Sequence, residues 1–171
     1  MSSVKLLKLG TNPEKECVFL STTPSENGFE NPYFKITPEE YMHRVIPERY
    51  KASKGIGLKP NYVPDTYFFL YNENDTIVGL FKIRHYLNDT LKNGAGHIGY
   101  IIKREYRNHG YATIGIHLAL KKLKHLALLR ETEAYFQISR DNIYSYKALI
   151  KNKAYIVKMT EDYIYLRIKL R

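Results

Sequence analysis

The stretch that decides the fold reads Arg107-Asn108-His109-Gly110-Tyr111-Ala112. It has the pattern R-x-x-G-x-A and joins a β-rich run at 96–102 to a helix-like segment at 112–129. A glycine-bearing turn that opens a helix presents unpaired backbone N–H groups and the positive end of the helix dipole. Such a turn can hold a phosphate-bearing ligand. By itself the pattern is also that of an ordinary strand-to-helix turn with an exposed arginine.

The sequence on both sides of the hexapeptide favours the anion-binding interpretation. The segment that follows has the i, i+3, i+4, i+7 apolar spacing of a helix that packs on a core. Its apolar positions include Ala112, Ile116, Ala119, Leu120, Leu123 and Leu126. Lys121 and Lys124 fall on the other side, as expected for a solvated face. The hexapeptide therefore lies where a strand leads into a helix, which is the context that an anion cradle requires.

Composition limits the classes of protein that the chain can belong to. A length of 171 residues fits a single domain over 1–171. No apolar run approaches the about 18 to 20 residues of a membrane span, and the N-terminus lacks the apolar region of a signal peptide. The only cysteine, Cys17, excludes an internal disulfide framework and a cysteine-based zinc site. We therefore expect a cytoplasmic protein without a metal.

The net charge of +10 is compatible with an anionic cofactor. The basic residues are scattered along the chain, so the charge does not by itself identify a ligand.

The remaining sequence predicts alternating strands and helices. We expect strands at 4–9, 67–71, 76–86, 97–102, 133–139, 154–159 and 163–169, and helices from 38, at 112–129 and at 142–151. Thr37, Pro38 and Glu40 form a helix start, and Pro47 should kink or stop that helix. This order predicts an α+β fold, a mostly antiparallel sheet with helices packed on it.

On these residues the chain resembles the GNAT superfamily of acetyl-CoA-dependent N-acetyltransferases. The resemblance rests on the hexapeptide, the strand at 99–102 and Asn142-Ile143-Tyr144-Ser145 after the next strand. It covers about residues 65–159, and a bacterial subgroup of predicted acetyltransferases looks closer still, with patterns such as Ile83-Arg84-His85-Tyr86-Leu87-Asn88. It implies a three-layer fold whose twisted, splayed sheet is flanked by helices.

The resemblance also implies where coenzyme A binds. The backbone N–H groups of Arg107, Asn108, His109, Gly110, Tyr111 and Ala112 would hold the pyrophosphate, and Gly110 would allow close approach. The strand that carries Ile101 and Ile102 would bulge and leave a gap for the pantetheine arm, with a backbone N–H polarising the thioester carbonyl. Asn142 would contact the pantetheine or cap the helix, and Ser145 would contact the cofactor, cap or pack.

The implied reaction is transfer of the acetyl group of acetyl-CoA to a primary amine of a small molecule or protein by direct attack. The tyrosine that often protonates the leaving thiolate is replaced by Leu149, so Tyr146 is the nearest candidate, although out of register. His97 is the candidate base, but strict alternation turns it away from the site unless a bulge intervenes. A structural role for His97 is the alternative.

The acceptor side of the site is less defined. Arg84 and His85, at the end of a strand, could line the acceptor pocket, and Arg84 would suit a carboxylate. Alternatively, both belong to an exposed strand end. Relatives are often dimers, so a homodimer is one expected assembly.

Two other functions stay open. One is a coenzyme A-binding protein without transferase activity, which the leucine at 149 allows. The other is a basic nucleic-acid-binding protein, which has charge in its favour but no cluster of Lys and Arg with interleaved aromatics.

Overall fold

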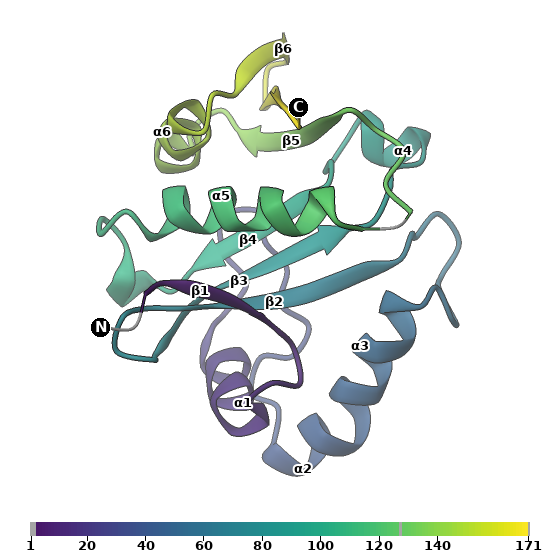
Figure 1. The fold of residues 1–171 in the computed structure, drawn as a ribbon, viewed down its shortest axis with the longest axis vertical. Helices are drawn as coiled ribbons and strands as arrows, with labels where there is room; N and C mark the ends of the chain where they lie inside the picture. The colour runs from purple at the N-terminus through teal and green to yellow at the C-terminus, as the bar shows by residue number, and fades with distance from the viewer. Residues whose placement is uncertain (1–2, 127, 171) are drawn as a thin grey trace.

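The framework of the protein is two antiparallel sheets, seen in a computed structural model that describes residues 3–126 and 128–170 (Figure 1). The first sheet has the order β1-β2-β3-β4, with β1 at Lys5–Lys8, β2 at Asp65–Tyr71, β3 at Ile77–Arg84 and β4 at Ile98–Ile102. The second has the order β5-β7-β6, with β5 at Glu133–Ser139, β6 at Tyr155–Met159 and β7 at Tyr163–Lys169. The predicted antiparallel α+β architecture is confirmed.

The two sheets separate along β4. Within the described residues, the backbone pairing between them is an isolated bridge of Gly96 with Phe136, beside which the His97 N–H donates to the Tyr135 carbonyl at 2.8 Å. From Ile98 onward β4 pairs with β3 alone, so its other edge is open. The splay that the sequence implies is therefore present. The implied bulge is not, because β3 and β4 pair in unbroken register from Ile98 to Ile102.

Two of the helices that come after β4 in the chain are α5 (Tyr111–Lys124) and α6 (Ile143–Lys151). Helix α5 lies across the first sheet, and α6 starts at its N-cap Asn142 as predicted. Helix α5 ends before the predicted Leu129. Leu126 and Leu129 still pack on the core, but from turns, so their apolar spacing did not require a helix. Residue 127 lies outside the described part of the chain.

The N-terminal region contains a helix that the sequence analysis missed. Helix α1 (Pro13–Thr22) is capped by the Asn12 side chain, which accepts the Lys15 N–H at 3.2 Å. Asn12 followed by Pro13 is the same kind of start signal as Thr37 followed by Pro38. The segment at 88–94, expected to be irregular, likewise contains a short helix, α4 (Asp89–Lys92).

Pro47 was expected to kink or stop the helix that begins at Pro38, and it does not stop it. The helix runs through α2 (Pro38–Glu40), a π-helical turn η1 (Tyr41–Val45) and α3 (Ile46–Ser53). In the wider turn the Ile46 N–H bonds to the Tyr41 carbonyl five residues back. Pro47 then lies at the start of α3, where a proline is tolerated because no backbone donor is needed.

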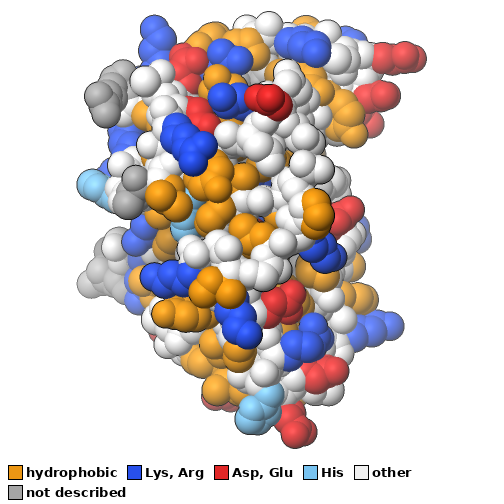
Figure 2. All heavy atoms as spheres, turned by 90° about the vertical axis from the view of Figure 1, so that its right-hand side faces the viewer, with side chains coloured by type: hydrophobic (Ala, Val, Ile, Leu, Met, Phe, Trp, Pro, Cys, Tyr) orange, Lys and Arg blue, Asp and Glu red, His pale blue; other side chains and the backbone are white. Residues whose placement is uncertain are grey.

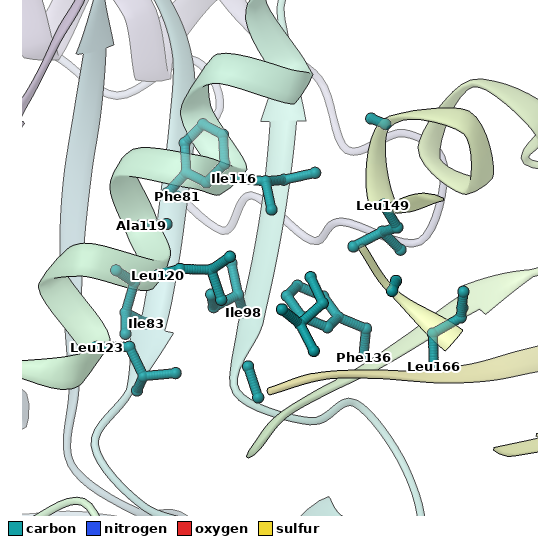
Figure 3. Close-up of a cluster of buried hydrophobic side chains, with 14 of the residues drawn as sticks. Phe81, Ile83, Ile98, Ile116, Ala119, Leu120, Leu123, Phe136, Leu149 and Leu166 are labelled. Carbon is teal, nitrogen blue, oxygen red and sulfur yellow. The ribbon is translucent and has the colours of Figure 1, made fainter. Parts of the chain in front are cut away.

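The helices cover both faces of the first sheet (Figure 1). Helices α1 to α3 lie on one face, over a buried cluster that includes Phe69, Leu80 and Ile101. Helix α5 lies on the other face, where Ile98, Phe136 and Leu166 join one core between the two sheets (Figure 3). In the described part of the chain, no helix has the length and apolar character needed to cross a bilayer.

Candidate functional site

The turn before α5 presents free backbone donors. After the short helix η2 (Arg104–Tyr106), Asn108 and Gly110 adopt left-handed conformations with φ of 65° and 80°. Among the described residues, no acceptor lies within hydrogen-bonding range of the N–H groups of Asn108, His109 or Gly110, and the first turn of α5 adds the usual unpaired donors. A Cβ built on Gly110 would meet nothing within 4 Å, so the turn is open to a ligand. These features fit a pyrophosphate.

The side chains of this turn hold it in place. Arg107 donates from Nε to the Ile102 carbonyl at 2.9 Å and from Nη1 and Nη2 to the Glu26 carboxylate at 3.0 and 2.8 Å. The Arg107 hydrogen bonds lower the pKa of Glu26 to about 2. The His109 Nδ1 lies 2.7 Å from the Arg107 carbonyl, and the Tyr111 hydroxyl donates to Glu73 at 3.1 Å. The guanidinium of Arg107 is thus occupied by Glu26, and the backbone is left to bind an anion.

The open edge of β4 continues from this turn into the gap between the sheets. Ile101 and Ile102 are both buried, and their side chains enter the cores on opposite faces of the first sheet. Because the Lys103 N–H bonds to the Val78 carbonyl, the alternation of the ladder directs the backbone groups of Ile101 at β3 and those of Tyr100 and Ile102 at the gap. The Ile102 carbonyl already accepts from Arg107, so the Ile102 N–H and the backbone groups of Tyr100 border the gap. An extended amide-containing chain could pair with this edge as an added strand does.

Tyr100 on β4 spans the gap between the sheets at one point. The Tyr100 hydroxyl donates to Ser145 Oγ at 2.7 Å, and its ring stacks on Phe81 with centroids 5.2 Å apart. Burial raises the pKa of Tyr100 to about 12. Ser145 is held in turn by Asn142, whose Oδ1 accepts the Ser145 N–H at 3.2 Å. One polar chain therefore links β4 to the first turn of α6. In the sequence, Tyr100 is one residue of an apolar strand pattern, and no motif marks it as a site residue.

His97 is fully buried at the point where the two sheets meet. Its Nδ1 accepts the Tyr135 N–H at 2.9 Å, and its Nε2 lies 3.3 Å from Glu131 Oε2 without hydrogen-bond geometry. Burial lowers the pKa of His97, and the neighbouring carboxylate opposes that shift only in part. A neutral ring that accepts at Nδ1 and carries its proton on Nε2 fits these neighbours.

The other candidate proton carriers lie on α6. Leu149 is completely buried and belongs to the core between the sheets (Figure 3). Tyr146 is partly buried against the same core.

The structure separates Arg84 from His85. The His85 Nε2 lies 2.8 Å from Thr66 Oγ1, whereas Arg84 is paired in register with Asp65 and donates from Nη1 to the Gly96 carbonyl at 3.0 Å. Neither is an exposed strand end: His85 is buried and Arg84 is half-buried.

Arg84 belongs to a cluster with Asp65, Lys82 and Arg49. The Arg49 Nη1 donates to Asp65 Oδ1 at 3.1 Å, and the Lys82 Nζ lies 3.8 Å from Asp65 Oδ2. Sequence analysis missed Asp65, Lys82 and Arg49. The available signal was charge at alternate positions, Asp65 and then Lys82 and Arg84, in strands that are otherwise apolar or aromatic.

A family model described as the acetyltransferase (GNAT) family matches residues 29–148. The chain belongs to the GNAT family of acetyltransferases. This GNAT protein is therefore an acyltransferase, and its cofactor is acetyl-CoA. No curated protein is similar enough in sequence to count as a match.

Solved structures of acetyltransferases share the fold of this GNAT protein. The ribosomal-protein-S5-alanine acetyltransferase from Vibrio fischeri is 16% identical, with a TM-score of 0.63 over 99% of this chain and 94% of that chain. RimJ from Mycobacterium smegmatis, in complex with CoA-disulfide, is 13% identical, with a TM-score of 0.66 over 97% and 81%. AAC(6')-Ib, in complex with ribostamycin and coenzyme A, is 13% identical, with a TM-score of 0.65 over 98% and 94%.

Proposed function

We propose that this protein transfers the acetyl group of acetyl-CoA to a primary amine of a small molecule or protein by direct attack. One observation carries the proposal: the unpaired N–H groups at 108–110 lead directly into the open edge of β4. The first feature suits the pyrophosphate and the second suits the pantetheine arm of one cofactor. The amine acceptors named for structural neighbours, which include spermidine, are consistent with this reaction.

In this proposal the cofactor residues act mainly through their backbone. The N–H groups at 108–112 bind the pyrophosphate, whereas the Arg107 N–H already bonds to the Arg104 carbonyl. Ile102 presents its N–H at the strand edge to the pantetheine, whereas Ile101 directs its backbone groups at β3. Both the oxygen and the nitrogen of the Asn142 side-chain amide have a role in the proposal. Its Oδ1 caps α6, and its Nδ2, which has no partner among the described residues, is available to an amide oxygen of the cofactor.

We propose that Tyr100 protonates the leaving thiolate in place of the tyrosine that Leu149 replaces. Its hydroxyl lies at the gap and, like any tyrosine hydroxyl, carries its proton at neutral pH. Tyr146 is the second candidate. His97 is fully buried, its Nδ1 accepts the Tyr135 N–H and its Nε2 lies 3.3 Å from Glu131, so the proposed role of His97 is to join the sheets and not to act as a base.

Two other functions are less well supported. A coenzyme A-binding protein without activity would share the turn and the strand edge, but the family that the chain belongs to is one of acetyltransferases. Nucleic-acid binding calls for a basic stripe, whereas the face in Figure 2 mixes basic side chains with acidic and hydrophobic ones.

The test combines binding of acetyl-CoA by calorimetry with thiol release across a panel of amines. Gly110→Asp should weaken acetyl-CoA binding roughly tenfold or more, because it sets a carboxylate against the pyrophosphate. Gly110→Asn is the matched control, since asparagine tolerates a left-handed backbone and has the same size without the charge.

Equal affinity in the two folded Gly110 variants would refute the anion cradle. Saturable binding without thiol release from any amine would favour the non-catalytic alternative.

A further inference from the structure

The face of the first sheet that α1 to α3 cover carries an excess of positive charge. Asp65 on β2, Lys82 and Arg84 on β3, and Arg49 on α3 form one group, which we call the cationic cluster. It has three cationic side chains and one carboxylate, and the Asp65 side chain is only 4% exposed. Glu30 and Glu48 act on the cluster from a distance, but both are exposed, so solvent screens their charges.

Two of the three cations have donors without a hydrogen-bond acceptor among the described residues, although the Arg49 guanidinium stacks on the Tyr67 ring with its carbon 4.6 Å from the ring centroid. The Arg49 Nε is buried with no partner among the described residues. The Lys82 Nζ has one carboxylate neighbour, at 3.8 Å, which is beyond hydrogen-bonding distance. Burial and the neighbouring Arg84 lower the pKa of Lys82. The buried Arg49 Nε is costly to keep without an acceptor, and an oxyanion in the cluster would offset that cost. The Lys82 side chain is 21% exposed, so its ammonium can reach a ligand that enters from solvent.

The cationic cluster lies one strand away from the gap. Lys82 is paired in register with Gly99 on β4, so the two share a face of the sheet. Gly99 has no side chain to cover this face, and even a Cβ built there would meet the Phe29 ring only at ordinary van der Waals distance, 3.8 Å. Neighbouring strands are about 4.8 Å apart. A small molecule whose amine reaches the edge of β4 could therefore place a second group among these cations.

We propose that the cationic cluster binds an anionic group, a carboxylate or a phosphate, on the acceptor amine. The proposal rests on the proposed transferase function and names its substrate class. Lys82 and Arg49 supply donors to the anion, and Arg84 is held beside them by the Gly96 carbonyl. Polyamines would be repelled by the same charges.

Thiol release with matched acceptors tests the proposal. β-Alanine is compared with β-alaninamide, and O-phosphoethanolamine with ethanolamine, so that the carboxylate and the phosphate are tested separately. The anionic member of at least one pair should have a kcat/KM about tenfold or more higher, the effect of one to two charge-assisted hydrogen bonds. Equal or better use of the uncharged members or of spermidine would overturn the proposal.

Variants of Lys82 link that preference to the cationic cluster. Lys82→Met keeps the apolar stem and should abolish the preference, with no change in acetyl-CoA affinity, whereas Lys82→Arg should restore it. Lys121→Met, which removes one charge from the exposed face of α5, is the control and should keep the preference. If folded Lys82→Met still preferred the anionic acceptors, the anion would bind elsewhere, and the assignment of the cationic cluster as its site would be refuted.

A binding measurement separates this proposal from the transferase function. In the ¹⁵N-labelled protein, O-phosphoethanolamine or β-alanine should shift the Gly99 amide resonance in a saturable way, and the shift should disappear in Lys82→Met. If no amine releases thiol but the shift is seen, the transferase proposal fails and the anion site stands. If amines are acetylated but neither compound shifts Gly99, the anion site is wrong and the transferase stands.

Discussion

A single hydroxyl, that of Tyr100, carries the proposed proton transfer. It lies on β4, its ring packs on Phe81, and its hydrogen bond to Ser145 reaches α6 across the gap. Because Tyr100 and Ser145 are far apart in the sequence, their pairing depends on how the two sheets separate. In the proposal, the tyrosine that protonates the thiolate therefore lies on β4 and not at the Leu149 position of α6.

Replacing Tyr100 by Phe should lower kcat for thiol release by about 100-fold, the usual contribution of a positioned acid. The affinity for acetyl-CoA should stay within a factor of a few, because the ring and its packing are retained. Tyr144→Phe, at an exposed position on α6, is the control. A large loss in Tyr146→Phe together with full activity in Tyr100→Phe would transfer the role to Tyr146.

At the scale of elements, the turn at 107–112 depends on the N-terminal segment. Glu26 accepts hydrogen bonds from both Arg104 and Arg107, and so ties the segment after α1 to the turn before α5. Since Arg107 also holds the Ile102 carbonyl, the same contact fixes the turn relative to β4. Residues outside the hexapeptide therefore help to shape the anion cradle.

The pairing of Glu26 with Arg107 should appear in the acid stability of the protein. The folded pKa of Glu26, about 2, lies below its ordinary value of 4.5. A depressed carboxyl pKa stabilises the folded state fully above the ordinary value and loses that effect as the pH falls toward 2. The free energy of unfolding, from urea titrations between pH 5 and 2.5, should therefore fall less steeply in Glu26→Gln. Glu105→Gln, at an exposed site, should behave as wild type; equal slopes in all three proteins would contradict the prediction.

At the scale of the whole molecule, His97 and Glu131 join the two sheets. The His97 N–H donates to the Tyr135 carbonyl, and the His97 Nδ1 accepts the Tyr135 N–H. Glu131 accepts the Leu87 N–H at 2.8 Å. A Cβ on Gly96 would lie 2.1 Å from the Tyr135 carbonyl oxygen, so only glycine allows this close approach. The gap can open along β4 because the sheets are held together at this end.

His97→Ala should lower the free energy of unfolding by about 2 to 4 kcal/mol, through a cavity and the lost acceptor of the Tyr135 N–H. Since burial lowers the pKa of His97, the unfolded chain binds the proton more tightly, and stability is lost as the pH falls below the ordinary 6.5. The difference between wild type and variant should thus shrink below pH 6.5. His85 shifts in the same direction in both proteins, so it cancels.

Exposed His43 provides the control, as His43→Ala should leave stability unchanged. Loss of transfer activity in His97→Ala with unchanged stability would instead indicate a catalytic histidine.

Local signals in the sequence were enough to predict most elements. The strand patterns, the cap at Asn142 and the glycine turn at 110 depend on neighbours close in the chain, and the structure has each of them. The Asn12–Pro13 start of α1 was equally local and was overlooked. The prediction that Pro47 could stop the helix failed because the π-helical turn before it depends on tertiary packing. Tyr41 and Val45 of η1 pack into the core.

The sequence by itself determined the antiparallel fold, the glycine turn before α5 and the family. Only the tertiary structure brought Tyr100 to Ser145, Arg107 to Glu26, and Arg49 to Asp65 and Lys82. The reason is physical: a turn or a cap is stabilised by bonds over a few residues, whereas these polar contacts join elements that meet only when the apolar faces of the sheets and helices are buried.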